Sequence, residues 1–243
     1  MLPKCLQPLT LVTRRYMKWS KAVVQSGPFK GMKYIDRAYC SSLTPKIAGT
    51  YEQELHPYLP LLLEPKPDVF IDIGAAEGYY AVGAALFGWS QEIIAYETNP
   101  DALAGVRELM SLNGVGTDRI RLNGICTPES LGKALEGRVN PAVIMDVEGF
   151  EAFLLDPLRV PGLSKCRILL EYHDFVLPGL SDEIIRRMSP THEITRIDQA
   201  PRAGDLVCDD PVVRASPAFV RRHLLTERRP PVNHGWMWLS PHR

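Results

Sequence analysis

The sequence predicts an α/β protein with a doubly wound, mostly parallel sheet of seven strands and an N-terminal extension. Three observations predict this fold. Short apolar segments typical of buried strands alternate along the chain with helical segments. The first strand runs into a turn of small residues and then an Ala/Gly-rich helix, within residues 69–85. Acidic residues follow several strands, at the edge where open parallel sheets bind ligands.

The composition describes a globular chain without a charge bias. Of 243 residues, 45% are hydrophobic, and 28 basic residues balance 28 acidic ones, so no net charge attracts nucleic acid. The five cysteines lack C-x-x-C spacing, which indicates packed thiols in a reducing compartment. No apolar run reaches the ~20 residues of a membrane helix, and the basic N-terminus lacks the apolar region of a secretory signal. We therefore expect a cytoplasmic protein with no integral membrane segment and no nucleic-acid partner.

We expect residues 1–48 to form an N-terminal extension or cap and residues 49–243 to form the main domain. Residues 1–26 mix apolar and basic side chains, which indicates a helix packed on the domain or on a second subunit of a homodimer. The alternative is a basic face against an anionic membrane. Residues 27–48 are rich in turn formers and are expected to form short strands or loops that cover one end of the site.

The segment at residues 49–63 precedes the first strand of the sheet. Thr50 and Gln53 have the spacing of a helix capping box, and two prolines limit regular helix to short pieces. Tyr51 and Glu52 then lie in the first turn of the capped element. They form either one face of this helix or a wall of the cofactor pocket.

The turn after the first strand has the composition of a nucleotide-binding loop. A dinucleotide-binding turn reads G-x-G-x-x-G, whereas this turn has glycine only at its first and fifth positions. Glycine permits close backbone approach, and the N-terminus of the next helix offers unpaired N–H groups. We favour a cofactor site over a turn that is glycine-rich for packing alone. The residues concerned are Asp72, Gly74, Ala75, Ala76, Glu77, Gly78 and Tyr79.

A second acid ends the strand at residues 93–97. Glu97 lies 19 residues after Gly78, close to the ~20-residue spacing at which a carboxylate holds the hydroxyls of a ribose. The alternative is an exposed carboxylate near a helix start, because Asn99 and Pro100 fit the N-cap and first helical positions. Since Glu97 precedes this cap, we assign Glu97, with Thr98 beside it, to the cofactor site.

The middle of the chain continues the alternation of strands and helices. The helix from Asn99 is expected to close at Asn113 and Gly114, and a half-buried strand follows at residues 119–123. Thr127 and the proline after it begin a helix that ends near residue 137, before a buried strand at residues 142–145.

Three acids, Asp146, Glu148 and Glu151, crowd the turn after the strand at residues 142–145. Acids in this turn can cap a helix, which stabilises it by ~0.3–1 kcal/mol. Three acids are more than one cap requires. We therefore favour a binding site in this turn, where a cofactor and the substrate that accepts its group would meet.

The strand within residues 167–174 repeats this form and ends among Glu171, His173 and Asp174. A lone histidine is more often structural, but His173 follows a strand at the same expected edge as Asp72.

The remaining chain predicts a helix from Ser181 to about residue 188, a strand at 194–197, a long lid-like segment at 199–233 with a helix from Pro217, and a last strand at 235–239. Trp236 and Trp238 share one face of that strand and are expected in the core.

Five segments closely resemble, in order, the motifs of FkbM-like methyltransferases: GTYEQEL, VFIDIGAAEGYYAVG, AYETNP, IMDVEGFE and LLEYHD, within residues 49–174. The resemblance implies a class I, Rossmann-like methyltransferase fold with S-adenosyl-L-methionine as cofactor. It also implies methylation of a hydroxyl on a small molecule, glycan or lipid.

The resemblance extends to single residues. Asp72, Gly74, Glu77 and Gly78 match the cofactor loop, Glu97 matches the ribose acid, and Asp146, Glu148, Gly149 and Glu151 match the second signature. Ile144 stands where the family often has lysine, so any role of that lysine is absent or relocated in this chain.

The resemblance suggests a mechanism in which a base takes the proton of the acceptor hydroxyl. We nominate His173 first because its unperturbed pKa is near ~6.5, Asp146 second, and Glu148 as support. No metal is required, although the carboxylates with His173 could alternatively hold a divalent cation. The alternative hypotheses for the function are a nicotinamide-dependent oxidoreductase and a non-catalytic module that binds S-adenosylmethionine.

Overall fold

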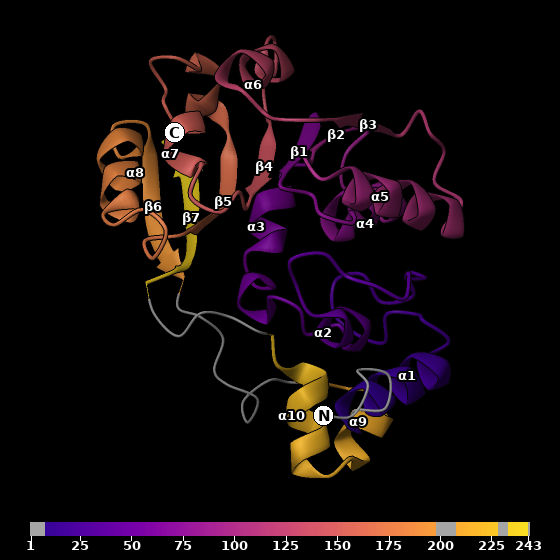
Figure 1. Ribbon diagram of the computed structural model, residues 1–243. Coiled ribbons are helices and arrows are strands. Elements are labelled where there is room, and N and C mark those ends of the chain that lie inside the picture. The colour runs from indigo at the N-terminus through magenta and orange to yellow at the C-terminus, as the bar shows by residue number, and fades with distance from the viewer. Residues whose placement is uncertain (1–7, 198–207, 228–232, 243) are drawn as a thin grey trace.

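The computed structural model, which describes residues 8–197, 208–227 and 233–242, contains one seven-stranded sheet with the order β3-β2-β1-β4-β5-β7-β6 (Figure 1). Strands β1 to β5 are parallel, and β7 runs antiparallel between β5 and β6. The predicted doubly wound, mostly parallel sheet is confirmed. The strands are β1 (Val69–Ile73), β2 (Glu92–Tyr96), β3 (Ile120–Asn123), β4 (Ala142–Met145), β5 (Arg167–Tyr172), β6 (His192–Ile197) and β7 (Gly235–Pro241).

Helices cover both faces of the sheet because its strands are apolar on both faces. In β1, Phe70 packs into one core while Ile71 packs into the other. The first core receives α4 (Tyr79–Leu86) and α5 (Pro100–Leu112), and the second receives α6 (Pro128–Leu135), α7 (Glu151–Leu154), a 3₁₀ turn at Pro161–Lys165 and α8 (Leu180–Met188). Both tryptophans of β7, Trp236 and Trp238, lie in the first core, as expected.

Segments from the two ends of the chain form one cap beside the sheet. Helices α1 (Pro8–Ser20) and α2 (Leu43–Ala48) contact α10 (Ala218–Leu225), which contacts α9 (Pro211–Ala215). In Figure 1 these four helices gather at the end of the molecule opposite α6. A buried hydrogen bond of 2.5 Å, from the Tyr16 hydroxyl to Asp210, ties α1 to the N-cap of α9. The N-terminal extension is therefore packed against the C-terminal part of its own chain.

The structure corrects the predicted elements around this cap. Residues 27–48 were expected to form only short strands or loops, but they contain α2, and α9 was not predicted. The predicted lid at residues 199–233 is described only at 208–227, where α9 and α10 lie; the rest lies outside the described residues. No helix among the described residues is long and apolar enough to cross a membrane.

The prediction of a helix capped at Thr50 is wrong. The backbone N–H groups of Gly49, Thr50 and Tyr51 all point to the carbonyl of Pro45, so this stretch closes α2 instead of opening a helix. Glu52 follows in the left-handed conformation (φ 48°), before a 3₁₀ turn at Gln53–Leu55 and helix α3 (Leu59–Leu63). The local spacing was overridden by the left-handed Gly49 at the end of α2.

Ser181 was also expected to cap a helix, but Gly179 occupies the N-cap of α8. The side chain of Asp174 instead accepts hydrogen bonds from the backbone N–H of Ser181 (2.7 Å) and from its hydroxyl (2.6 Å). Both carboxylate oxygens of Asp174 therefore stabilise the first turn of α8.

Candidate active site

A cavity of about 390 Å³ opens at the carboxyl edge of the sheet, where β1, β2 and β4 end. Most residues predicted to bind the cofactor line it: Tyr51, Glu52, Asp72, Gly74, Ala75, Ala76, Tyr79, Glu97, Thr98 and Asp146. Glu77 and Gly78 are not among its lining residues. Trp236 of β7 also lines this cavity, in addition to its place in the core.

The turn after β1 passes close to the backbone of β4. At Gly74, where φ is +88°, a Cβ atom would overlap the carbonyl oxygen of Asp146. Only glycine adopts this conformation and also permits this approach. Gly74 therefore joins the two strand ends that carry Asp72 and Asp146.

Asp72 lies at the base of the cavity with 3% of its surface exposed. Its Oδ2 atom is buried and has no hydrogen-bond partner among the described residues. Burial, and then the charges of Glu97 and Asp146, raise the pKa of Asp72 to about 7. An orphaned buried carboxylate oxygen is costly unless a ligand cation satisfies it.

Glu97 connects two turns at the other side of the cavity. Its Oε2 atom accepts a hydrogen bond from the backbone N–H of Ala76 at 2.8 Å, and its Oε1 atom accepts one from Asn99 at 2.7 Å. The side chain of Asn99 caps α5, as predicted. Glu97 is therefore a rigidly held carboxylate on the cavity wall, directly after β2.

Glu77 has a structural position behind the loop. It is fully buried and accepts hydrogen bonds from Lys46 Nζ (2.5 Å), the Tyr34 hydroxyl (2.6 Å) and the backbone N–H of Tyr39 (3.0 Å). Although burial alone would raise it, the pKa of Glu77 is lowered by the charge and hydrogen bond of Lys46 and by the other donors. The N-terminal extension thus holds the turn after β1 in place through these hydrogen bonds to Glu77.

Lys46 was not singled out in the sequence. It is 1% exposed, lines the cavity, and places its ammonium 4.6 Å from the centre of the Tyr51 ring. No local pattern marks a lysine in a six-residue helix as the partner of an acid 31 residues later. Only the folded extension shows it.

Replacing Lys46 with Met is expected to lower the free energy of unfolding by about 3–5 kcal/mol, because it leaves Glu77 as a buried unpaired charge. Urea denaturation measures this change, with the exposed Lys30→Met as the matched control. The double variant Lys46→Met/Glu77→Gln should recover part of the loss. A decrease in the free energy of unfolding below about 1 kcal/mol for Lys46→Met would contradict the idea that this ion pair stabilises the fold.

A smaller cavity of about 100 Å³ adjoins the first. The two cavities share the lining residues Cys40, Ser41, Tyr51, Glu52, Asp146 and Glu148. The smaller cavity adds Ser42, Glu171, His173, Phe175, Glu227 and His234. Its lining contains five acids and, among the described residues, no lysine or arginine.

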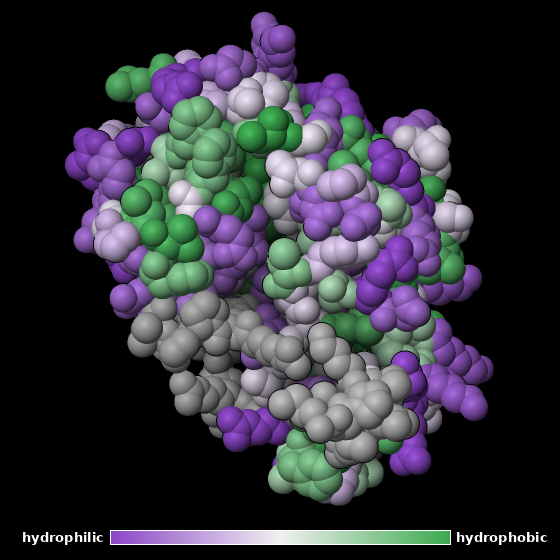
Figure 2. Space-filling model, in the orientation of Figure 1, coloured by the Kyte–Doolittle hydropathy of each residue, from purple (hydrophilic) through white to green (hydrophobic). Residues whose placement is uncertain are grey.

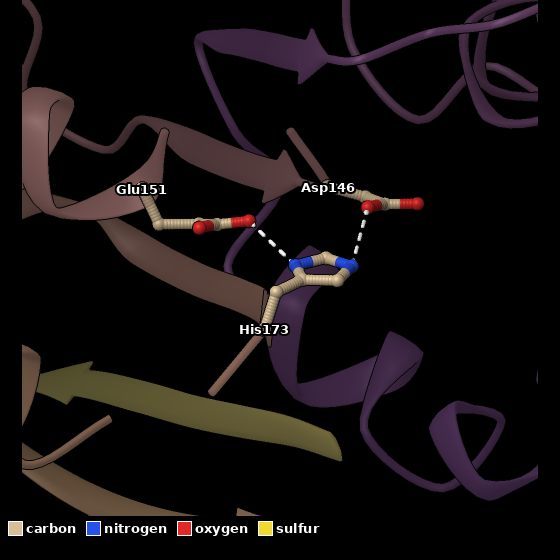
Figure 3. Close-up of side chains that lie close together, drawn as sticks. All are labelled: Asp146, Glu151 and His173. Carbon is tan, nitrogen blue, oxygen red and sulfur yellow. Dashed lines mark hydrogen bonds and ion pairs between the residues drawn. The ribbon is translucent and has the colours of Figure 1, made fainter. Parts of the chain in front are cut away.

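His173 is held between acids from both sides, as Figure 3 shows for Glu151 and Asp146. Its Nδ1 atom lies 2.8 Å from Glu151 Oε1. Its Nε2 atom faces Asp146 Oδ1 at 3.5 Å, Glu148 Oε2 at 3.6 Å and Glu171 Oε2 at 3.9 Å. The structure thus brings together all three residues nominated for catalysis, and it adds Glu151 and Glu171.

The charged groups of this cluster shift one another's pKa values. Burial alone would lower the pKa of His173, but the hydrogen bond to Glu151 and the charges of Asp146, Glu151 and Glu148 raise it. Burial, with Glu148 and Glu151, raises the pKa of Asp146 to about 6, against the opposing charge of His173. A site with perturbed groups of both kinds in a cleft is a candidate for proton chemistry.

No family model matches the chain, and no curated protein matches it. Among solved structures, spermidine synthase from Thermotoga maritima has a TM-score of 0.50 at 14% identity, over 79% of this chain and 59% of that chain. The M1A22 tRNA methyltransferase TrmK from B. subtilis has a TM-score of 0.42 at 16% identity, over 58% of this chain and 59% of that chain. The C-terminal domain of precorrin-6Y C5,15-methyltransferase from Rhodobacter capsulatus has a TM-score of 0.44 at 18% identity, over 77% and 89%.

This chain spans 59% of the length of the first two of these proteins. At 14% identity the similarity to spermidine synthase shows the fold alone. The chain has a Rossmann-like, seven-stranded α/β fold. The resemblance to the FkbM-like family remains a prediction.

Proposed function

We propose that the protein is a methyltransferase that uses S-adenosyl-L-methionine and methylates a hydroxyl group. The observation that carries the proposal is the buried, unpartnered Oδ2 of Asp72 at the base of the 390 Å³ cavity. The methionine part of this cofactor ends in an ammonium and a carboxylate. The ammonium can satisfy Asp72, and the backbone N–H groups of the loop suit the carboxylate.

The rest of the cavity fits the other parts of the cofactor. Glu97 offers a carboxylate for the hydroxyls of the ribose, and Thr98 lies beside it. Apolar side chains that include Ile125, Phe150 and Leu154 line the same cavity and suit a flat aromatic base. These features support the cofactor over a nicotinamide dinucleotide, whose pyrophosphate would call for the G-x-G-x-x-G turn that is missing here.

The acceptor is assigned to the smaller cavity, because Asp146 and Glu148 line both cavities and His173 faces the smaller one. The bound cofactor supplies a methyl group on a sulfonium, which is already a strong electrophile. The chain has to align the acceptor oxygen with that methyl and remove the hydroxyl proton. The geometry of His173, Asp146 and Glu148 supports this role, since a neutral Nε2 can accept a proton or bind a cation.

The surroundings of the site bear on the acceptor class. Figure 2 shows hydrophobic side chains gathered over the region of α7 and α8. Exposed apolar residues there include Phe150 and Phe153, at the start of and within α7, and Phe175, Val176 and Leu177 before α8. An apolar rim beside an acidic pocket supports a neutral or lipid-like small molecule or glycan and disfavours a nucleic-acid backbone. A homodimer and a cytoplasmic location also remain proposals from the sequence.

Calorimetric titration with S-adenosylhomocysteine tests the proposal. We expect micromolar binding that Glu97→Ala weakens at least ~10-fold, because the variant loses a charged hydrogen-bond acceptor. The exposed Glu136→Ala is the matched control and should bind like the wild type. Absence of binding would overturn the proposal, and binding of NAD instead would favour the oxidoreductase. Binding without any methyl transfer would favour the non-catalytic module.

A further inference from the structure

The smaller cavity contains a set of metal-type donor atoms from two adjacent strand ends. Asp146 and Glu148 follow β4, and Glu171 and His173 stand at the end of β5. Strands β4 and β5 are parallel neighbours, so their carboxyl ends lie side by side. All four residues line the cavity of about 100 Å³, which leaves room for a cation and water.

The distances within this set are longer than hydrogen bonds. The three carboxylates lie 3.5, 3.6 and 3.9 Å from Nε2 of His173. Two ligands of one metal, each ~2.0–2.2 Å from it, lie about 3–3.5 Å apart. Each carboxylate therefore stands near the distance from Nε2 that two ligands of one cation have, and binding would need only a small contraction.

His173 is oriented as a ligand by a buried acid behind it. Glu151 is fully buried, and its Oε1 accepts from Nδ1 of His173 while also facing the backbone N–H groups of Val147 and Gly149 at 3.3 and 3.2 Å. A carboxylate on one ring nitrogen fixes the tautomer and directs the lone pair of the other nitrogen outward. In Figure 3 the second nitrogen points to Asp146.

Two buried oxygens in this cluster have no hydrogen-bond partner among the described residues. They are Asp146 Oδ1 and Glu151 Oε2, on opposite sides of the imidazole, and Glu151 is 0% exposed. Unpartnered buried carboxylate oxygens are costly. No lysine or arginine of the described residues lines the cavity, so a bound cation would offset the charge of its acids together with His173.

We propose that Asp146, Glu148, Glu171 and Nε2 of His173 bind one divalent first-row metal ion such as Mn²⁺. Carboxylate oxygens suit Mg²⁺, Mn²⁺ and Ca²⁺, and the imidazole nitrogen shifts the preference toward a transition metal. This proposal replaces the sequence-based expectation that no metal is required. It makes His173 a ligand, with Glu151 as its positioning residue.

The role of this ion in catalysis rests on the proposed function, whereas the site itself does not. An ion held by these residues would lower the pKa of an acceptor hydroxyl, and Glu148, whose side chain is 62% exposed, would take that proton through its other oxygen and pass it to water. The acceptor oxygen then forms a bond to the methyl carbon. The sulfur–methyl bond breaks with its electron pair on sulfur, so the sulfonium becomes a neutral thioether.

Mn²⁺ titration of the EDTA-treated, dialysed protein tests the site, with free Mn²⁺ followed by electron paramagnetic resonance. We expect one ion per chain with a dissociation constant below about 100 μM. Glu148→Gln and Glu171→Gln should each weaken binding at least ~10-fold. The exposed Glu193→Gln is the control and should bind as the wild type does. Because Glu148 is exposed, its variant tests the site without a threat to the fold.

Two results would overturn the metal site: no saturable binding up to about 1 mM Mn²⁺, or equal affinity in the wild type and both variants. S-adenosylhomocysteine binding, measured on the same metal-free samples, separates this outcome from the proposed function. Mn²⁺ binding without S-adenosylhomocysteine binding would leave the metal site standing and remove the methyltransferase. S-adenosylhomocysteine binding without Mn²⁺ binding would overturn the metal site and leave the proposed methyltransferase standing.

Discussion

Replacing Asp72 with Asn should weaken S-adenosylhomocysteine binding about 30-fold or more. The neutral side chain loses a buried ion pair with the ligand ammonium, and truncating such a pair costs ~2–5 kcal/mol. Asn is nearly the same size as Asp, so the cavity keeps its shape. Calorimetry at neutral pH measures the change, and the exposed Asp182→Asn is the matched control.

The affinity of the wild type should also depend on pH with a definite sign. The pKa of Asp72 is raised to about 7 in the free protein, mainly by burial. The ligand ammonium binds the ionised carboxylate, so affinity should rise as pH increases through about 7 and fall about tenfold per unit below it. Titrations between about pH 5.5 and 7.5 measure this slope, and Asp72→Asn should lose it. Equal slopes in the two proteins would contradict the assignment.

Stability provides the check that Asp72→Asn remains folded. A carboxyl whose folded pKa lies above its unfolded value destabilises the protein as pH rises from about 4 to about 7, because the unfolded state ionises first. The variant lacks this penalty and should be at least as stable as the wild type at pH 8. Stability retained together with lost binding therefore identifies a ligand contact.

The sheet could be predicted from the sequence because its signals are local. Buried parallel strands are short apolar runs, and the acids that end them are consecutive with those runs. Asp72, Glu97, Asp146 and His173 were therefore placed at one edge by the topology of a parallel sheet alone. Asn99 was found for the same reason, since an N-cap acts within three residues.

The parts that could not be predicted depend on contacts between distant segments. Lys46 reaches Glu77 across 31 positions, and Tyr16 reaches Asp210 across 194. No periodicity encodes such pairs. Thr50 shows the converse error: its capping spacing is present, yet the end of α2 takes the backbone hydrogen bonds of that stretch. The sequence placed Glu77 in the cofactor site, whereas the fold uses it to hold the loop.

Replacing His173 with Gln should reduce methyl transfer at least ~100-fold while the affinity for S-adenosylhomocysteine stays within about twofold. Glutamine lacks the basic ring nitrogen that either accepts the proton or binds the cation, and losing such a group costs ~10²–10⁴ in rate. Cofactor affinity should persist because His173 lines only the smaller cavity. The assay follows tritium-labelled methyl groups from S-adenosylmethionine into the small-molecule and lipid fractions of a cell extract. The exposed His242→Gln is the control.

Glu151→Gln separates the orientation of the imidazole from its presence. The amide keeps the size of the buried side chain but no longer offers a charged acceptor to Nδ1, so the lone pair of Nε2 is no longer fixed toward Asp146. Loss of such a supporting carboxylate costs ~10–100-fold in activity or metal affinity. Methyl transfer should therefore fall by less than in His173→Gln, and Mn²⁺ affinity should fall with it. Full activity in Glu151→Gln would show that the hydrogen bond to Nδ1 only packs the ring and does not orient it for catalysis.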